Sequence, residues 1–134
     1  LGYKVTALEQ NGKLLSGAKC ETIICSGEKT PFEDKEFDFS MAICILHHCK
    51  NPLAILKEMK RISKKVIIQE PNRNNLLVRS FITLTPIRHT EDLNAHYDKN
   101  GLKSILKESG LKTDKFLDQG VFFYPNVYYW AICS

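Results

Sequence analysis

The sequence predicts a single α/β domain, residues 1–134, whose sheet is mostly parallel. Apolar, β-prone runs alternate along the chain with segments of helical periodicity, as expected of parallel strands joined by helices. The run at residues 37–46 is almost continuously apolar, which is typical of a strand covered on both faces. With 134 residues, 43% of them hydrophobic, the chain has the length and composition of one globular domain.

The first part of the chain predicts three strands. Residues 3–8 alternate between apolar and polar and end at the turn signal Glu9-Gln10-Asn11-Gly12. A short segment at 13–19, which is compatible with a helix, leads to a second strand at 21–25. A polar, proline-containing loop then separates this strand from the one at 37–46.

The middle of the chain predicts a helix followed by a buried strand. Asn51 can cap a helix and Pro52 suits its first turn, after which apolar residues recur at helical spacing as far as Ile62. Residues 66–68 form the core of a buried strand, which the turn signal Glu70-Pro71-Asn72 ends.

The last part of the chain predicts two helices and two strands. The pattern is weakest after the buried strand, where we expect a short helix at 76–81. Asp98 can cap a further helix, which Gly110 closes. Turn residues between the final β-rich runs, at 113–117 and 127–133, predict an antiparallel strand at the C-terminal edge of the sheet.

Composition and charge exclude several classes of protein. The net charge of +4 is spread along the chain, and its densest basic segment, 57–65, is typical of a solvated helix face, so we expect no nucleic-acid partner. The sequence contains no apolar run long enough to span a bilayer. Five cysteines without CxxC spacing, three of them in apolar runs, indicate reduced thiols and a cytoplasmic protein.

Polar residues follow the predicted strands directly, where ligands of open α/β sheets bind. They are Glu9-Gln10, Ser26-Gly27-Glu28, the corner at 44–49 and Glu70-Pro71-Asn72. Glu9 is the most informative, because a carboxylate at such a strand end can accept hydrogen bonds from both hydroxyls of a ribose. The alternative for Glu9 is a solvated turn residue.

In order and spacing, these segments resemble the class I S-adenosylmethionine-dependent methyltransferases, most closely the group that acts on small molecules. The resemblance runs from Gly2 to about Gly110 and depends on four segments, 2–9, 26–32, 37–48 and 70–72. Its most specific part is the spacing of three pairs, Pro31-Phe32, Phe37-Asp38 and His47-His48. It implies a Rossmann-like methyltransferase sheet, S-adenosyl-L-methionine as cofactor and a small-molecule acceptor.

By position, the resemblance implies seven cofactor-binding residues, Glu9, Gln10, Ser26, Gly27, Glu28, Ala42 and Ile43. Glu9 matches the acid that holds the ribose hydroxyls. Ser26 stands where the family often has an aspartate for the adenine amino group; it can accept a hydrogen bond but brings no charge. The backbone N–H of Gly27 matches a contact to the adenine ring, and Ala42 and Ile43 match positions beside the methionine end.

His47 and His48 are the candidate catalytic residues. Either could line the acceptor pocket and take a proton during methyl transfer, and a hydrogen-bonded structural histidine is the alternative. Together with Cys44 and Cys49 they offer zinc-type ligands, but neighbouring residues at a strand end point in different directions, so we expect no metal. The later segment is expected to supply an acceptor pocket or lid through Phe81, Arg88, His89 and His96.

The glycine-rich loop that follows the first strand in this family is absent from the sequence. The seven glycines include no GxG, and the first recognisable strand corresponds to the family's second. The missing first strand is central in the family's sheet, so its loss would exceed the total stability of a typical domain, about 5–15 kcal/mol. We therefore expect the C-terminal portion of a longer methyltransferase domain, with the first strand and first helix missing. Direct pairing of the second strand with the fourth is the structural alternative.

The sequence thus predicts transfer of a methyl group from S-adenosyl-L-methionine to a small molecule, carried out by a domain of which this chain is an incomplete or inactive fragment. Such a transfer needs alignment and desolvation more than a catalytic triad. One alternative is a non-catalytic methyltransferase-like interaction module that has lost its cofactor loop. Another is a nicotinamide dinucleotide enzyme, which also places an acid after its second strand.

Overall fold

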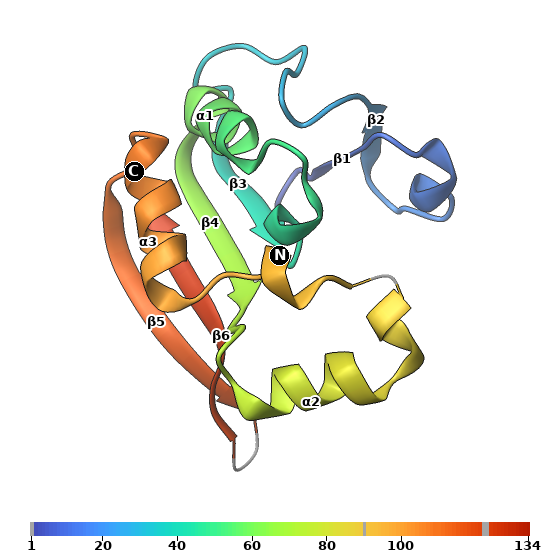
Figure 1. Cartoon of the computed structure of the whole chain (residues 1–134). Coiled ribbons are helices and arrows are strands. Elements are labelled where there is room, and N and C mark those ends of the chain that lie inside the picture. The colour runs from blue at the N-terminus through green and yellow to red at the C-terminus, as the bar shows by residue number, and fades with distance from the viewer. Residues whose placement is uncertain (1, 90, 122–123) are drawn as a thin grey trace.

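The strands form two separate sheets in the computed structural model, which describes residues 2–89, 91–121 and 124–134 (Figure 1). In the smaller sheet, β1 (Thr6–Glu9) pairs in parallel with β2 (Glu21–Ile24). The larger sheet has the order β3-β4-β6-β5. Its strands are β3 (Phe37–Ile43), β4 (Ser63–Pro71), β5 (Thr113–Val121) and β6 (Tyr124–Cys133).

This topology confirms the predicted α/β class and the antiparallel strand. β3 and β4 are parallel, whereas β6 runs antiparallel to both β4 and β5. The antiparallel strand lies one position in from the edge, which β5 occupies. Within the described residues, β1 pairs only with β2, and β3 only with β4, so the expected place of the family's first strand between β1 and β3 is open. The alternative, a direct pairing of β1 with β3, is wrong.

Two helices, α1 (Pro52–Ile62) and α3 (Lys99–Glu108), cover one face of the larger sheet, as Figure 1 shows. Their ends follow the predicted signals. The Ala54 N–H donates to the Asn51 side chain over 3.1 Å, and the Gly101 N–H donates to Asp98 over 2.7 Å. Gly110 has a φ of +79°, the left-handed conformation expected of a residue that closes a helix.

The hydrophobic core lies between these helices and the sheet. Leu56 of α1 and Leu102 and Leu106 of α3 are fully buried. They meet side chains that point from the same face of β3, β4 and β6, among them Ala42, Val66, Ile68, Ala131 and Cys133.

The opposite face of the larger sheet is apolar but largely uncovered by the described residues. Phe39, Met41 and Ile43 of β3 are 53%, 56% and 43% exposed. Met41 and Ile67 line a shallow hollow there together with residues of β5 and β6. The prediction that the 37–46 strand is covered on both faces is therefore wrong for the described part of the chain, because the helices pack on one face alone.

The remaining elements lie at the carboxyl ends of the strands. α2 (Leu76–Leu84) is longer than the helix predicted at 76–81, and Asn75 caps it by accepting hydrogen bonds from two of its N–H groups. The one-turn 3₁₀ helices η3 (Pro86–His89) and η4 (Leu93–Ala95) follow it. Near the N-terminus, the expected helix at 13–19 is a single 3₁₀ turn, η1 (Gly12–Leu15). Among the described residues, no helix has the length and hydropathy needed to cross a membrane.

Candidate functional site

The parallel pairing of β1 and β2 brings the first two groups of predicted cofactor residues to neighbouring strand ends. Glu9, the last residue of β1, is in register with Ile24, so Ser26 and Gly27 follow on the adjacent strand. Glu9 Oε1 accepts a hydrogen bond of 3.0 Å from the Asn11 N–H, and Ser26 Oγ accepts one of 3.2 Å from the Glu28 N–H. These bonds shape the turns after each strand.

The turn after β3 lies within electrostatic reach of carboxylates at the strand ends of both sheets. Burial raises the pKa of the Cys49 thiol, and the negative charges of Glu70, Glu28 and Glu9 raise it further. Glu9 and Glu28 are thus close enough to influence a residue that follows β3. Gly27 faces α1, since a Cβ added to it would lie 3.7 Å from the Ile55 side chain.

The other predicted cofactor residues differ in accessibility. Gln10 is exposed beyond the end of β1, and Ile43 is 43% exposed near the end of β3. The Ala42 side chain points into the hydrophobic core, so a ligand could reach only its backbone. Cys44, which follows Ile43, has a φ of +53°, and β3 thus ends three residues before the predicted boundary.

Glu70 fixes the turn that follows β3. Its side chain is fully buried, and Oε1 accepts hydrogen bonds from the backbone N–H groups of Ile45 and Leu46, at 3.1 and 2.8 Å. Oε2 lies 2.5 Å from His47 Nδ1. The Glu70 carboxylate therefore fixes the backbone of the turn and also orients the ring of His47. His47 lies in the 3₁₀ turn η2 (Leu46–His48).

His47 belongs to a cluster of three histidines around Glu91. His47 Nε2 and His96 Nε2 lie 3.5 and 3.6 Å from Glu91 Oε2, and His48 Nε2 lies 3.3 Å from Oε1. The rings of His47 and His96 are stacked with their centroids 4.1 Å apart. The side chains of His47 and His96 are almost fully buried, whereas that of His48 is 47% exposed.

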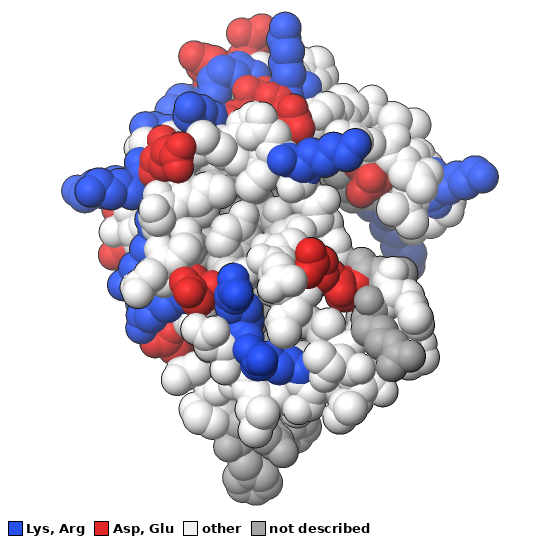
Figure 2. All heavy atoms as spheres, in the orientation of Figure 1, with Lys and Arg blue, Asp and Glu red and all other residues white. Residues whose placement is uncertain are grey.

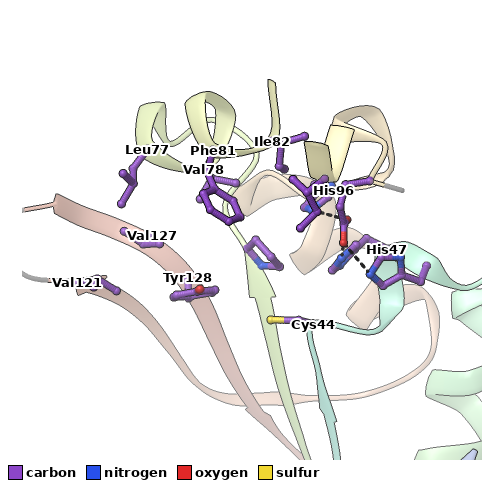
Figure 3. Close-up of a pocket in the computed structure, with 14 residues that line it drawn as sticks. Cys44, His47, Leu77, Val78, Phe81, Ile82, His96, Val121, Val127 and Tyr128 are labelled. Atoms are coloured by element: carbon purple, nitrogen blue, oxygen red, sulfur yellow. Dashed lines mark ion pairs between the residues drawn. The ribbon is translucent and has the colours of Figure 1, made fainter. Parts of the chain in front are cut away.

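The cluster forms one wall of a pocket of about 430 Å³. Figure 3 shows the opposite walls, where apolar side chains of α2 and β6 face the histidines; the apolar lining includes Leu77, Val78, Phe81, Ile82, Val127 and Tyr128. Of the residues expected around an acceptor pocket, Phe81 and His96 line it. His89 is exposed on η3, and the Arg88 side chain lies outside the described residues.

Comparisons with known proteins agree with this architecture. A family model described as a methyltransferase domain matches residues 1–66. A SAM-dependent methyltransferase from Thermotoga maritima, described as a possible histamine N-methyltransferase, matches 94% of this chain and 70% of its own with a TM-score of 0.72 and 15% identity. A Pyrococcus horikoshii protein matches 99% of this chain and 72% of its own with a TM-score of 0.73 and 17% identity. The chain has the fold of a class I S-adenosylmethionine-dependent methyltransferase.

Two further matches bear on the extent of this chain and on its relatives. An uncharacterized protein of Methanocaldococcus jannaschii is 32% identical over 76 residues, which make up 54% of this chain. The chain covers only 37% of that relative's length. A structure of the complex between the Haloferax volcanii Trm112 methyltransferase activator and a methyltransferase matches 96% of this chain and 70% of its own, with a TM-score of 0.73 and 10% identity.

The residues present suit the nucleoside part of S-adenosyl-L-methionine, the cofactor of class I methyltransferases. Glu9 offers a carboxylate for a ribose, and Ser26 and Gly27 offer polar groups on the neighbouring strand for an adenine. For the methionine end, the sequence has no counterpart of the family's glycine-rich loop.

The roles of two residues around this pocket could not be read from the sequence. Glu70 is recognisable as a polar residue after a strand, but only the structure shows that it holds the turn after β3. Glu91 lies in a segment without periodicity, so no pattern in the sequence connects it with His47, which is 44 residues earlier (91 − 47). Both carboxylates belong to the surroundings of the histidine pair.

Proposed function

We propose that the domain containing this chain transfers a methyl group from S-adenosyl-L-methionine to a small-molecule acceptor. The observation that carries the proposal is the position of the turn after β3, residues 44–49. On one side, Cys49 is close enough to Glu9 and Glu28 for their charges to act on it. On the other side, Cys44, His47 and His48 line the apolar pocket. A cofactor at the ends of β1 and β2 would thus adjoin a cavity suited to an acceptor.

The proposed roles follow from the positions of the residues. Glu9 holds the ribose hydroxyls, Gly27 and Ser26 contact the adenine, and the backbone at Ala42 and Ile43 borders the methionine end. When bound, the cofactor supplies an electrophilic methyl group. Gln10 and Glu28 border the nucleoside from the two turns.

His48 is the better candidate for accepting a proton from the acceptor. Its side chain is 47% exposed and borders the pocket, and the Glu91 carboxylate lies 3.3 Å from Nε2, where it can orient the ring. His47 is buried, with Nδ1 bonded to Glu70 and Nε2 directed at Glu91. We assign His47 to positioning.

The shape and lining of the pocket indicate the class of acceptor. About 430 Å³ lies within the range of small-molecule sites, and its walls are mainly apolar with polar groups at one end. A small apolar molecule with one nucleophilic heteroatom fits this arrangement, the heteroatom lying beside the histidines. On the face shown in Figure 2, basic side chains lie among acidic ones rather than in a continuous stripe, which supports a small molecule over a nucleic acid.

We also propose that this chain is the C-terminal portion of a longer cytoplasmic domain. The open position between β1 and β3 and the uncovered apolar face of β3 support a further strand and helix that complete the sheet. All five cysteines are free thiols, which supports a reducing compartment.

Calorimetric titration of the full-length protein with S-adenosyl-L-methionine tests the proposal. Glu9→Ala should weaken binding by about 1–3 kcal/mol, because a charge-assisted pair of hydrogen bonds to the ribose is lost. Glu108→Ala removes an exposed carboxylate at the end of α3 and should leave the affinity unchanged. An unchanged affinity in Glu9→Ala removes Glu9 from the site. No binding by the wild-type protein instead favours the non-catalytic interaction module, which the missing glycine-rich loop supports.

A further inference from the structure

Three ligand-type side chains meet at the buried end of the pocket, although they come from separate segments. His47 lies in η2, Glu91 lies between η3 and η4, and His96 follows η4. One ligand atom of each lies within 4.8 Å of the others. Figure 3 shows His47 and His96 beside each other at this end of the pocket, and their rings are stacked with centroids 4.1 Å apart.

In both rings Nδ1 has a hydrogen-bonding partner outside the cluster, and this leaves Nε2 facing the cluster. His47 Nδ1 lies 2.5 Å from Glu70 Oε2, and His96 Nδ1 lies 2.9 Å from the Asp92 carbonyl oxygen. Both partners are acceptors, so each Nδ1 carries the proton and donates it. The Nε2 atom of each ring is therefore the nitrogen that faces Glu91. Metal-binding histidines are held in this way, with the second nitrogen donating to a carboxylate or a backbone carbonyl.

Glu91 Oε2 lies 3.5 Å from His47 Nε2 and 3.6 Å from His96 Nε2 and accepts no hydrogen bond from any described residue, although this atom is buried. Two ring nitrogens and a carboxylate oxygen thus face one another, an arrangement that is stable only when a proton or a metal cation lies among them. The spacing suits a zinc ion. Bonds of about 2.1 Å in tetrahedral geometry place neighbouring ligands about 3.4 Å apart. The distances from Oε2 to the two nitrogens are 3.5 and 3.6 Å.

We propose that His47, Glu91 and His96 bind a divalent transition-metal ion of the zinc class. Two imidazole nitrogens and one carboxylate form a common three-residue set for zinc that retains an open coordination position. All three residues line the pocket, so the open position faces the cavity. These ligands differ from the cysteine-containing set considered from the sequence, because folding brings His96 and Glu91 to His47.

Titration of the metal-free protein with Co²⁺, which reports ligand type through its absorption spectrum, tests the site without cofactor or acceptor. We expect one Co²⁺ per chain, visible bands of a four- or five-coordinate ion, no thiolate-to-cobalt charge transfer, and displacement by Zn²⁺ but not by Mg²⁺. Glu91→Gln and His96→Ala should each weaken binding by at least about tenfold. His89→Ala, at an exposed histidine of η3, should bind as the wild type does.

Three results would overturn the proposal: no saturable binding, a spectrum with thiolate charge transfer, or full affinity in Glu91→Gln. Circular dichroism of each variant establishes that a loss of binding is not a loss of fold, and the near-isosteric Glu91→Gln covers the case in which His96→Ala fails to fold. Because neither S-adenosyl-L-methionine nor an acceptor is present, the result does not depend on the proposed methyl transfer.

Discussion

At the scale of single residues, Glu70 connects the sheet with the site. Its carboxylate is buried at the end of β4, where an unpaired charge would be costly, and three donors satisfy it. Two of these donors are the backbone N–H groups that follow the left-handed residue Cys44. The side chain therefore stabilises an unusual turn and at the same time orients His47.

Two substitutions of Glu70 separate these effects. Glu70→Ala should lower the free energy of unfolding by about 3–5 kcal/mol, because two buried N–H groups lose their acceptor. Glu70→Gln should cost about 1–3 kcal/mol, since its amide oxygen can still accept both backbone hydrogen bonds while the partner of His47 changes. Urea denaturation of both variants measures the difference. Equal losses would show that the backbone bonds contribute little.

At the scale of elements, Glu58 of α1 ties the loop before β3 to the helix. Its carboxylate accepts hydrogen bonds from Arg61, from the Thr30 backbone N–H and from the Thr30 hydroxyl, at 2.7–2.9 Å. The Arg61 bonds contribute most to lowering the pKa of Glu58 from 4.5 to about 2, against the opposing effect of burial. Arg61 also reaches Asp34 in the same loop, at 2.8 Å.

This contact predicts a pH dependence of stability. Because the pKa of Glu58 is lower in the folded chain than in the unfolded one, its contribution is complete above about pH 4.5 and is lost as the pH falls toward about 2. Glu58→Gln should destabilise the chain by about 1–3 kcal/mol near neutral pH. The difference in the free energy of unfolding between Glu58→Gln and the wild type should shrink as the pH falls from about 4.5 to about 2.

Urea denaturation at several pH values measures the gap between the two proteins. Glu108→Gln, at an exposed carboxylate of α3, should keep the pH dependence of the wild type. A gap that stays constant from neutral pH down to about pH 2 would contradict the pKa assigned to Glu58.

Local signals in the sequence predicted the ends of α1 and α3 but not the end of α2 or of β3. Asn51, Asp98 and Gly110 act through their own backbone neighbourhood, so their roles are visible in the sequence. β3 ends just before Cys44 because this residue has a left-handed conformation. Cys44 is not a glycine, so the sequence does not predict that conformation. Glu70, which accepts the backbone hydrogen bonds of this turn, is 26 residues later in the sequence (70 − 44). Sequence periodicity does not predict a contact between residues so far apart.

The same limit applies to the candidate site. Glu9 ends β1, and Ser26 and Gly27 come shortly after β2, so their common location could be predicted from parallel strand order. Glu91 and His96 reach His47 through two 3₁₀ turns, whose packing is set by long-range contacts such as the 3.0 Å bond from the Arg73 N–H to the Tyr97 carbonyl. Sequence patterns describe segments one at a time and do not contain this arrangement.

At the scale of the whole molecule, the larger sheet has a covered face and an uncovered face. Ile68 points to the helices and is fully buried, whereas its neighbour Ile67 lies beside the shallow hollow on the other face. From the sequence alone, both residues belong to a strand expected to be covered on both sides, and Ile67→Asp would be expected to prevent folding. The structure assigns that effect to Ile68.

Paired aspartate substitutions test this asymmetry. Ile68→Asp should abolish cooperative thermal unfolding, because it buries an unpaired charge in the core. Ile67→Asp should leave this 134-residue chain folded with a lower melting temperature, since water reaches the substituted face. Differential scanning calorimetry distinguishes the two. If the variants behave alike, the two faces are not covered as described.

The free side of β3 has a consequence for handling the isolated chain. Natural edge strands resist association through lysines, prolines or bulges, whereas β3 has the sequence Phe-Asp-Phe-Ser-Met-Ala-Ile with Asp38 as its single charge. Its backbone can therefore template the addition of an extended segment from another molecule. We expect the isolated chain to aggregate as its concentration rises and Met41→Lys to keep it monomeric, which size-exclusion chromatography over a range of concentrations measures.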